Sequence, residues 1–160
     1  MNTMETLLEQ YGESHQNPTN KLIHWVCIPF IVLSTVGLLW SIPSAYFDGI
    51  IPGLPAGLLN WGTILLALAM VYYLVLSRPI FFGLIPFVAA VIIGNYYLAQ
   101  LPWHLAITSA VIFAIAWVVQ FVGHEIEGKK PSFLKDVQFL LIGPAWMISF
   151  VLNRMGLRYA

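Results

Sequence analysis

Residues 79–124 read PIFFGLIPFVAAVIIGNYYLAQLPWHLAITSAVIFAIAWVVQFVGH and contain no lysine, arginine, aspartate or glutamate. A transmembrane helix needs about 20 largely apolar residues, so this run is long enough for two helices joined by a short turn. The segment 100–103, QLPW, suits that turn, because proline stops a helix and tryptophan favours the level of the lipid headgroups. The run therefore predicts transmembrane helices over residues 80–98 and 105–123.

Two more uncharged runs precede this one, on either side of Asp48. They predict transmembrane helices over residues 22–40 and 58–76, which makes four in total. A last apolar stretch, residues 137–152, is short for a membrane span, and Gly143-Pro144 interrupts it. We expect this fifth helix to be re-entrant, interfacial or thinly crossing.

The N-terminal residues 3–16 have a different pattern, that of an amphipathic helix. Apolar residues at positions 4, 7, 8 and 11 fall on one stripe, and glutamates fall on another. Asn17-Pro18 ends this helix, since proline lacks an amide donor and restricts the residue before it. The sequence as a whole predicts an all-α integral membrane protein with a single membrane domain over residues 1–160.

The composition agrees with a membrane protein and excludes several kinds of function. The chain is 59% hydrophobic and 9% charged, whereas about a quarter of the residues in soluble domains are charged. Its mean hydropathy is +0.82. The formal net charge of zero gives no indication of nucleic-acid binding. Cys27, the single cysteine, excludes an intramolecular disulfide and any metal site built on several thiolates.

The basic residues predict the orientation in the membrane, because lysine and arginine favour the cytoplasmic side. Four spans place five of these residues on the same side as the N-terminus: Lys21, Arg78, Lys129, Lys130 and Lys135. The N-terminus is therefore expected in the cytoplasm, in an inner membrane if the chain is bacterial or in the endoplasmic reticulum if it is eukaryotic. Arg154 and Arg158 fit this rule if the last segment returns to the same side.

Three of the four histidines fall on that cytoplasmic side. His15 and His24 flank the Asn17-Pro18 break, and His124 ends the helix predicted over 105–123, whereas His104 lies at the other end of the same helix. The break lets the first two approach each other, so the three imidazoles can converge as a facial metal site requires. With no thiolate available, such a site suits iron, manganese or zinc.

Other polar residues near these histidines are candidates for supporting roles. Asn20 or Thr19 can cap the helix that carries His24, and Asn17 belongs to the same turn. Glu125, Glu127 and Asp136 can accept hydrogen bonds from the ligands or add an oxygen ligand. Lys129 and Lys130 can pair with a substrate carboxylate, although they fit the positive-inside pattern better.

The ordered polar residues resemble the Mpo1-like family of membrane proteins, also called DUF962. The pattern that carries this resemblance is Tyr11 to His15, Asn17-Pro18-Thr19-Asn20, Ile23-His24, Gln120 to His124, Glu127 and Lys129-Lys130-Pro131. The resemblance implies an Fe²⁺-dependent dioxygenase that uses O₂ to shorten 2-hydroxy fatty acids by one carbon, in α-oxidation. It also implies that His15, His24 and His124 are the metal-binding and catalytic histidines and that Glu127 is the family's acidic residue.

Other functions remain open on the residues alone. His24 and His124 could be the axial ligands of a haem in a membrane redox protein. The chain could also be a non-catalytic scaffold or transporter whose interfacial histidines bind nothing, and a homo-oligomer is compatible with either function. The multi-histidine diiron hydroxylases fit poorly, because they need about twice as many histidines.

Overall fold

The structure, a computed structural model, describes residues 3–128 and 139–158. These residues form six α-helices, two short 3-10 helices and no strand. The elements are α1 (Thr3–Glu13), α2 (Pro18–Trp40), η1 (Ala45–Phe47), α3 (Trp61–Leu76), α4 (Arg78–Leu98), α5 (Leu105–Glu127), η2 (Phe139–Leu141) and α7 (Ile142–Arg154). The predicted all-α class is confirmed for this part of the chain.

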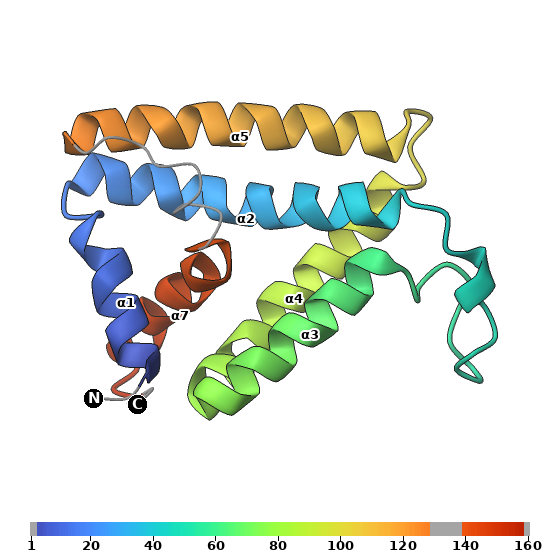
Figure 1. The fold of residues 1–160 in the computed structure, drawn as a ribbon, viewed down its shortest axis with the longest axis horizontal. Helices are drawn as coiled ribbons and strands as arrows, with labels where there is room; N and C mark the ends of the chain where they lie inside the picture. The colour runs from blue at the N-terminus through green and yellow to red at the C-terminus, as the bar shows by residue number, and fades with distance from the viewer. Residues whose placement is uncertain (1–2, 129–138, 159–160) are drawn as a thin grey trace.

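Two helix pairs make up most of the molecule. The helices α2 and α5 lie side by side and run in opposite directions, and the α3/α4 pair crosses them obliquely (Figure 1). A polar side chain joins the two pairs: Asn95 of α4 donates from Nδ2 to the carbonyl of Leu33 in α2, at 3.1 Å. Because the chain returns through α5, the beginning of α2 and the end of α5 lie at the same end of the molecule.

Three of the described helices, α2, α4 and α5, are long and apolar enough to cross a membrane. The helix α3 is also apolar but has 16 residues, or roughly 24 Å at about 1.5 Å per residue, less than the hydrocarbon thickness of about 30 Å. It begins at Trp61 and not at residue 58, because the Asn60 side chain accepts from the backbone N–H groups of Gly62 and Thr63 as its N-cap. The count of four spans stays a prediction.

The first long helix begins earlier than its predicted span of residues 22–40. Asn17 is its N-cap, accepting a hydrogen bond from the Thr19 backbone N–H at 2.9 Å, and Pro18 occupies the first turn. The expectation that Thr19 or Asn20 caps this helix was therefore wrong. The earlier start places His24 in the second turn of α2 and frees the Asn20 side chain for other contacts.

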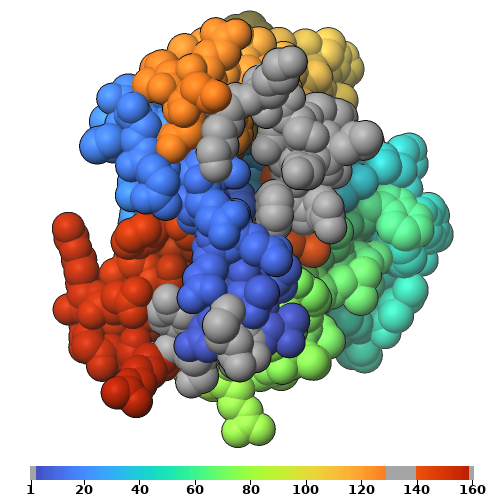
Figure 2. Space-filling model, turned by 60° about the vertical axis from the view of Figure 1, so that its left-hand side comes forward, coloured from blue at the N-terminus to red at the C-terminus, as the bar shows by residue number. Residues whose placement is uncertain are grey.

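The amphipathic α1 ends at Glu13, three residues short of the predicted 3–16. Beyond it the chain turns, with the backbone N–H groups of Ser14 and His15 donating to the carbonyls of Tyr11 and Gly12. The apolar stripe of α1 packs against α7, and its buried side chains are Met4, Leu8 and Tyr11. In the space-filling view α1 covers one end of the molecule, with α7 beside it and the ends of α2 and α5 above (Figure 2).

The last helix, α7, begins at Ile142, inside the stretch predicted over residues 137–152. Gly143 and Pro144 lie in its first turn and do not interrupt it, because a proline there removes no intrahelical hydrogen bond. This corrects the expectation of a break. The helix packs against both α1 and α4, and Ala145 and Trp146 are buried in the shared core. It thereby closes the end of the molecule where the three histidines lie.

Candidate metal centre

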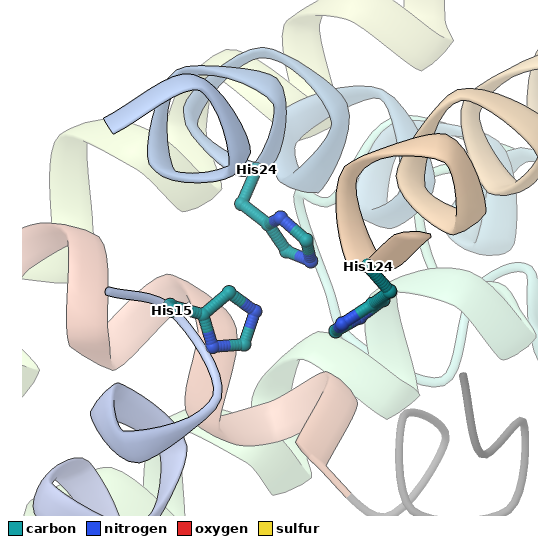
Figure 3. A group of neighbouring side chains, drawn as sticks. All are labelled: His15, His24 and His124. Atoms are coloured by element: carbon teal, nitrogen blue, oxygen red, sulfur yellow. The ribbon is translucent and has the colours of Figure 1, made fainter. Parts of the chain in front are cut away.

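Three histidines converge just beyond the end of α1, each from a different part of the chain. His15 follows α1, His24 lies in α2, and His124 lies in the last turn of α5 (Figure 3). Their exposed fractions are 3%, 1% and 5%. Each offers one ring nitrogen, and these three atoms all lie within 4.8 Å of one another. Among the described residues, this is the only group of three or more histidine, cysteine or acidic side chains placed to hold a metal ion.

The rings face one another edge to face. The centroid of His15 lies 4.2 Å from that of His24 and 5.3 Å from that of His124, and the last two are 4.9 Å apart. Because all three side chains are buried, water has little access to the space between them. The fourth histidine, His104, is exposed at the beginning of α5, at the opposite end of that helix, as the sequence predicted.

Two backbone carbonyls set the orientation of two of the rings. The Nδ1 of His15 lies 2.6 Å from the carbonyl oxygen of Tyr11, and the Nδ1 of His24 lies 3.0 Å from that of Asn20. A carbonyl oxygen only accepts, so each Nδ1 carries the proton and donates it. Each Nε2 then keeps its lone pair, which is the form in which histidine binds a metal.

Glu127 ties the turn that carries His15 to the helix that carries His124. Its two carboxylate oxygens accept from the backbone N–H of Gln16 at 2.8 Å, the backbone N–H of Asn17 at 2.9 Å and the Nδ2 of Asn20 at 3.0 Å. Glu127 follows His124 by three residues, so both lie on the same face of α5. These donors belong to the turn before α2 and to Asn20, and none of them is a histidine ring, so both roles expected for Glu127 at the metal stay predictions.

Asn20 connects three parts of the site. Its Nδ2 donates to Glu127 and also to the carbonyl of Ser14 at 3.2 Å, and its own carbonyl accepts from His24. The side chain is fully buried. The structure thus brings Asn17, Asn20 and Glu127 together at the site, whereas Lys129, Lys130 and Asp136 lie outside the described residues.

Two aromatic residues next to the histidines were not assigned to the site from the sequence. The Tyr11 ring stacks on His15 with centroids 4.2 Å apart and an interplanar angle of 10°. Trp146 of α7 lies 5.5 Å from His15 between ring centroids. The spacing of four residues between Tyr11 and His15 is a signal that could have indicated the first contact. Nothing in the sequence pairs Trp146 with a histidine more than a hundred residues away.

Gly123 allows α5 to approach α2 at the level of the site. A Cβ atom added there would lie 2.5 Å from the Oδ1 of Asn20 and 3.2 Å from the Cγ2 of Ile23. The Asn20 side chain cannot move away cheaply, because its Nδ2 is held by Glu127 and Ser14. The glycine is therefore a packing requirement of the site.

We expect Gly123→Ala to lower the free energy of unfolding by about 1–3 kcal/mol, the usual cost of overpacking. Thermal unfolding in detergent measures this change. Gly12→Ala in α1 is the control, because its added Cβ would meet only Trp146 Nε1, at 3.9 Å, and alanine is the better helix former. Equal unfolding temperatures for the two variants would contradict the close approach at Gly123.

Comparison with known proteins gives one family. The model of the family described as "2-hydroxy-palmitic acid dioxygenase Mpo1-like" matches residues 1–155. Among curated proteins, the chain is similar to the 2-hydroxy-palmitic acid dioxygenase MPO1 of Saccharomyces cerevisiae. The two are 27% identical over 151 residues, which cover 91% of this chain and 78% of the yeast protein. No solved structure matches the chain significantly.

Proposed function

The chain belongs to the Mpo1-like family, and we propose that it is a metal-dependent dioxygenase of 2-hydroxy fatty acids. His15, His24 and His124 bind the metal ion in this proposal. The observation that carries it is the convergence of three buried imidazoles from separate elements within 4.8 Å. The yeast relative, named for its action on 2-hydroxy-palmitic acid, supports the choice of substrate class and of O₂ as the second substrate.

The three side chains fit a metal ion. Nitrogen ligands bound to one ion at about 2.1 Å lie roughly 3–3.5 Å apart, so nitrogens up to 4.8 Å apart need only small side-chain rotations to close around it. Neutral imidazoles with no thiolate suit Fe²⁺, and three ligands on one face leave coordination positions open. We propose Fe²⁺ because dioxygenase chemistry needs a metal that reacts with O₂.

A bound Fe²⁺ would supply the oxygen activation that cleaves the bond between C1 and C2 of the hydroxy acid. The reaction balances without a reductant: C2 becomes the carboxyl carbon of the shorter acid, C1 leaves as carbon dioxide, and one water forms. The protein's own contribution is orientation and exclusion of water. The carbonyls of Tyr11 and Asn20 keep the protons of His15 and His24 on Nδ1, and Glu127 holds the turn that carries His15.

A haem between His24 and His124 fits less well than a single ion. A porphyrin would need an open plane between the two rings, whereas their centroids are only 4.9 Å apart. His15 also packs against both of them. The crowding of three rings therefore favours a non-haem ion.

The test of this function is product formation. Protein purified without oxygen and supplied with Fe²⁺ is incubated with 2-hydroxypalmitic acid and O₂, and the products are identified by mass spectrometry. We expect pentadecanoic acid, formed only when both the metal and oxygen are present. An iron-loaded protein that leaves the hydroxy acid unchanged would contradict the proposal.

We also propose that residues 1–160 form a single membrane domain with four spans and that the histidine site faces the cytoplasm. Lys21 and Arg78 support this orientation, since they lie in the first turn of α2 and at the beginning of α4, both at the end of the molecule near α1 (Figure 1). A reporter fused to the C-terminus is expected to be active in the cytoplasm, because α7 packs back against α1. A reporter active only on the opposite side would contradict this topology.

A further inference from the structure

A second cavity lies next to the histidine site, on the far side of Leu140. A small cavity of about 20 Å³ is lined by His24 and Gln120 among others, and Leu140 forms part of its wall. Leu140 also lines a larger cavity of about 60 Å³ between α2, α3, α4 and α7. Leu140 therefore borders both the histidine site and the larger cavity.

The walls of the larger cavity are apolar. The side chains that form them are mostly valine, leucine and phenylalanine, with Thr35 and Tyr73 as the two hydroxyl-bearing residues. Both hydroxyls are already engaged: Thr35 donates from Oγ1 to the carbonyl of Ile31 at 2.7 Å, and Tyr73 donates to that of Leu141 at 2.5 Å. The cavity thus offers its occupant hydrocarbon contacts, which suits an acyl chain and not a polar ligand.

One face of α2 leads from the histidine site into this cavity. His24 and Ile28 line the small cavity, and Val32 and Val36 line the larger one at the same helical spacing. From residue 24 to residue 36 the helix rises roughly 18 Å at about 1.5 Å per residue. That is close to the length of one leaflet's acyl chains, roughly half of the hydrocarbon thickness of about 30 Å.

The larger cavity also has a mouth on the surface of the protein. Two of its lining side chains, Leu65 of α3 and Leu141 of η2, are 37% and 39% exposed. A tail longer than the cavity can leave there into the hydrocarbon of the bilayer. The same opening gives a membrane-dissolved fatty acid a route to the histidines.

We infer that the acyl tail of the 2-hydroxy fatty acid passes through this cavity toward the bilayer and that the small side chains of Ala69 and Val88 keep the passage open for long tails. The inference rests on the proposed function for the identity of the head group. The carboxylate and hydroxyl lie beside His24 and Gln120, and the tail passes Leu140 into the larger cavity. The two small side chains belong to α3 and α4, so each can be enlarged separately.

Ala69→Phe tests this assignment through chain-length preference. The larger ring fills the cavity, so the variant is expected to lose at least about tenfold in kcat/KM for 2-hydroxypalmitic acid while retaining turnover of 2-hydroxyoctanoic acid. Val88→Phe, in α4, is expected to do the same. The matched control is Ala67→Phe, which adds the same ring at an exposed position of α3 outside the cavity. If Ala69→Phe and Val88→Phe had the same preference between the two hydroxy acids as Ala67→Phe, the inference would be overturned.

Cross-linking of the wild-type protein tests the same cavity without any substitution. A 2-hydroxy fatty acid with a photoreactive diazirine in mid-chain is expected to label Leu66 and Phe87. Label on Phe30 and Ile115, in the apolar groove on the outer face of α2 and α5, would overturn the inference. A wild-type protein that converts no hydroxy acid of any length would contradict the proposed function alone, because the cross-linked residues still decide where the tail lies.

Discussion

Replacement of His124 by alanine is expected to lower the turnover of 2-hydroxypalmitic acid by more than about 100-fold. Loss of a residue that only supports a metal ligand typically costs 10–100-fold, so loss of a ligand itself should cost more. His124 is the one member of the group that α5 contributes, and its removal leaves two imidazoles from the N-terminal part of the chain. Iron content and turnover, measured on the same preparation, should fall together.

The control for this variant is His104→Ala. His104 is also next to α5, but it is exposed and lies at the beginning of this helix, whereas His124 lies in its last turn. Its replacement is expected to leave both iron content and turnover within about twofold of the wild type, as surface substitutions away from a site usually do. If His124→Ala stayed active and His104→Ala did not, the assignment of the site would be wrong.

Glu127→Ala is expected to weaken Fe²⁺ binding by about 10–100-fold, although Glu127 is not a proposed ligand. Its carboxylate accepts from the backbone of Gln16 and Asn17 and from the side chain of Asn20, and these contacts fix the turn next to His15. Without these contacts the turn can move, and His15 is no longer held next to His24 and His124 before the metal binds. Titration with Fe²⁺ under anaerobic conditions measures the affinity.

Two further variants separate this positioning role from a simple loss of charge. Glu125→Ala removes the same charge from an exposed position two residues away and is expected to bind iron like the wild type. Glu127→Gln keeps the shape and one acceptor oxygen, so an intermediate affinity is expected. Equal affinities for Glu127→Ala and Glu125→Ala would show that the contacts of Glu127 do not support the site.

Much of the fold follows from the spacing of charged residues. The uncharged run of residues 79–124 covers most of the two long helices α4 and α5 and the turn between them, as predicted, although α4 begins at Arg78 and α5 ends at Glu127. Helix ends were less predictable, because they depend on which side chain caps the first turn: Asn17 begins α2 and Asn60 begins α3. The packing of α7 against α1 and α4 is a long-range contact that no local pattern encodes.

The grouping of the candidate ligands was also predictable from the sequence. The four predicted spans are an even number and so place the beginning of α2 and the end of α5 at the same end of the molecule, and the Asn17-Pro18 break lets His15 turn back toward His24. The hydrogen bonds that orient the rings of His15 and His24 were not predictable from the sequence, because both acceptors are backbone carbonyls. Every residue has a backbone carbonyl, so the identity of a residue does not indicate which carbonyl accepts.

The most direct test of the central claim, that three histidines hold one metal ion, is X-ray absorption at the iron edge of anaerobically loaded protein. The account predicts one iron per chain with scattering from three imidazole rings, bound through nitrogens at about 2.1 Å. The proposed ligands are His15, His24 and His124, so each single alanine variant should show fewer imidazoles or no bound iron. A wild-type spectrum with fewer than three imidazoles, or a protein that binds no metal, would contradict the account.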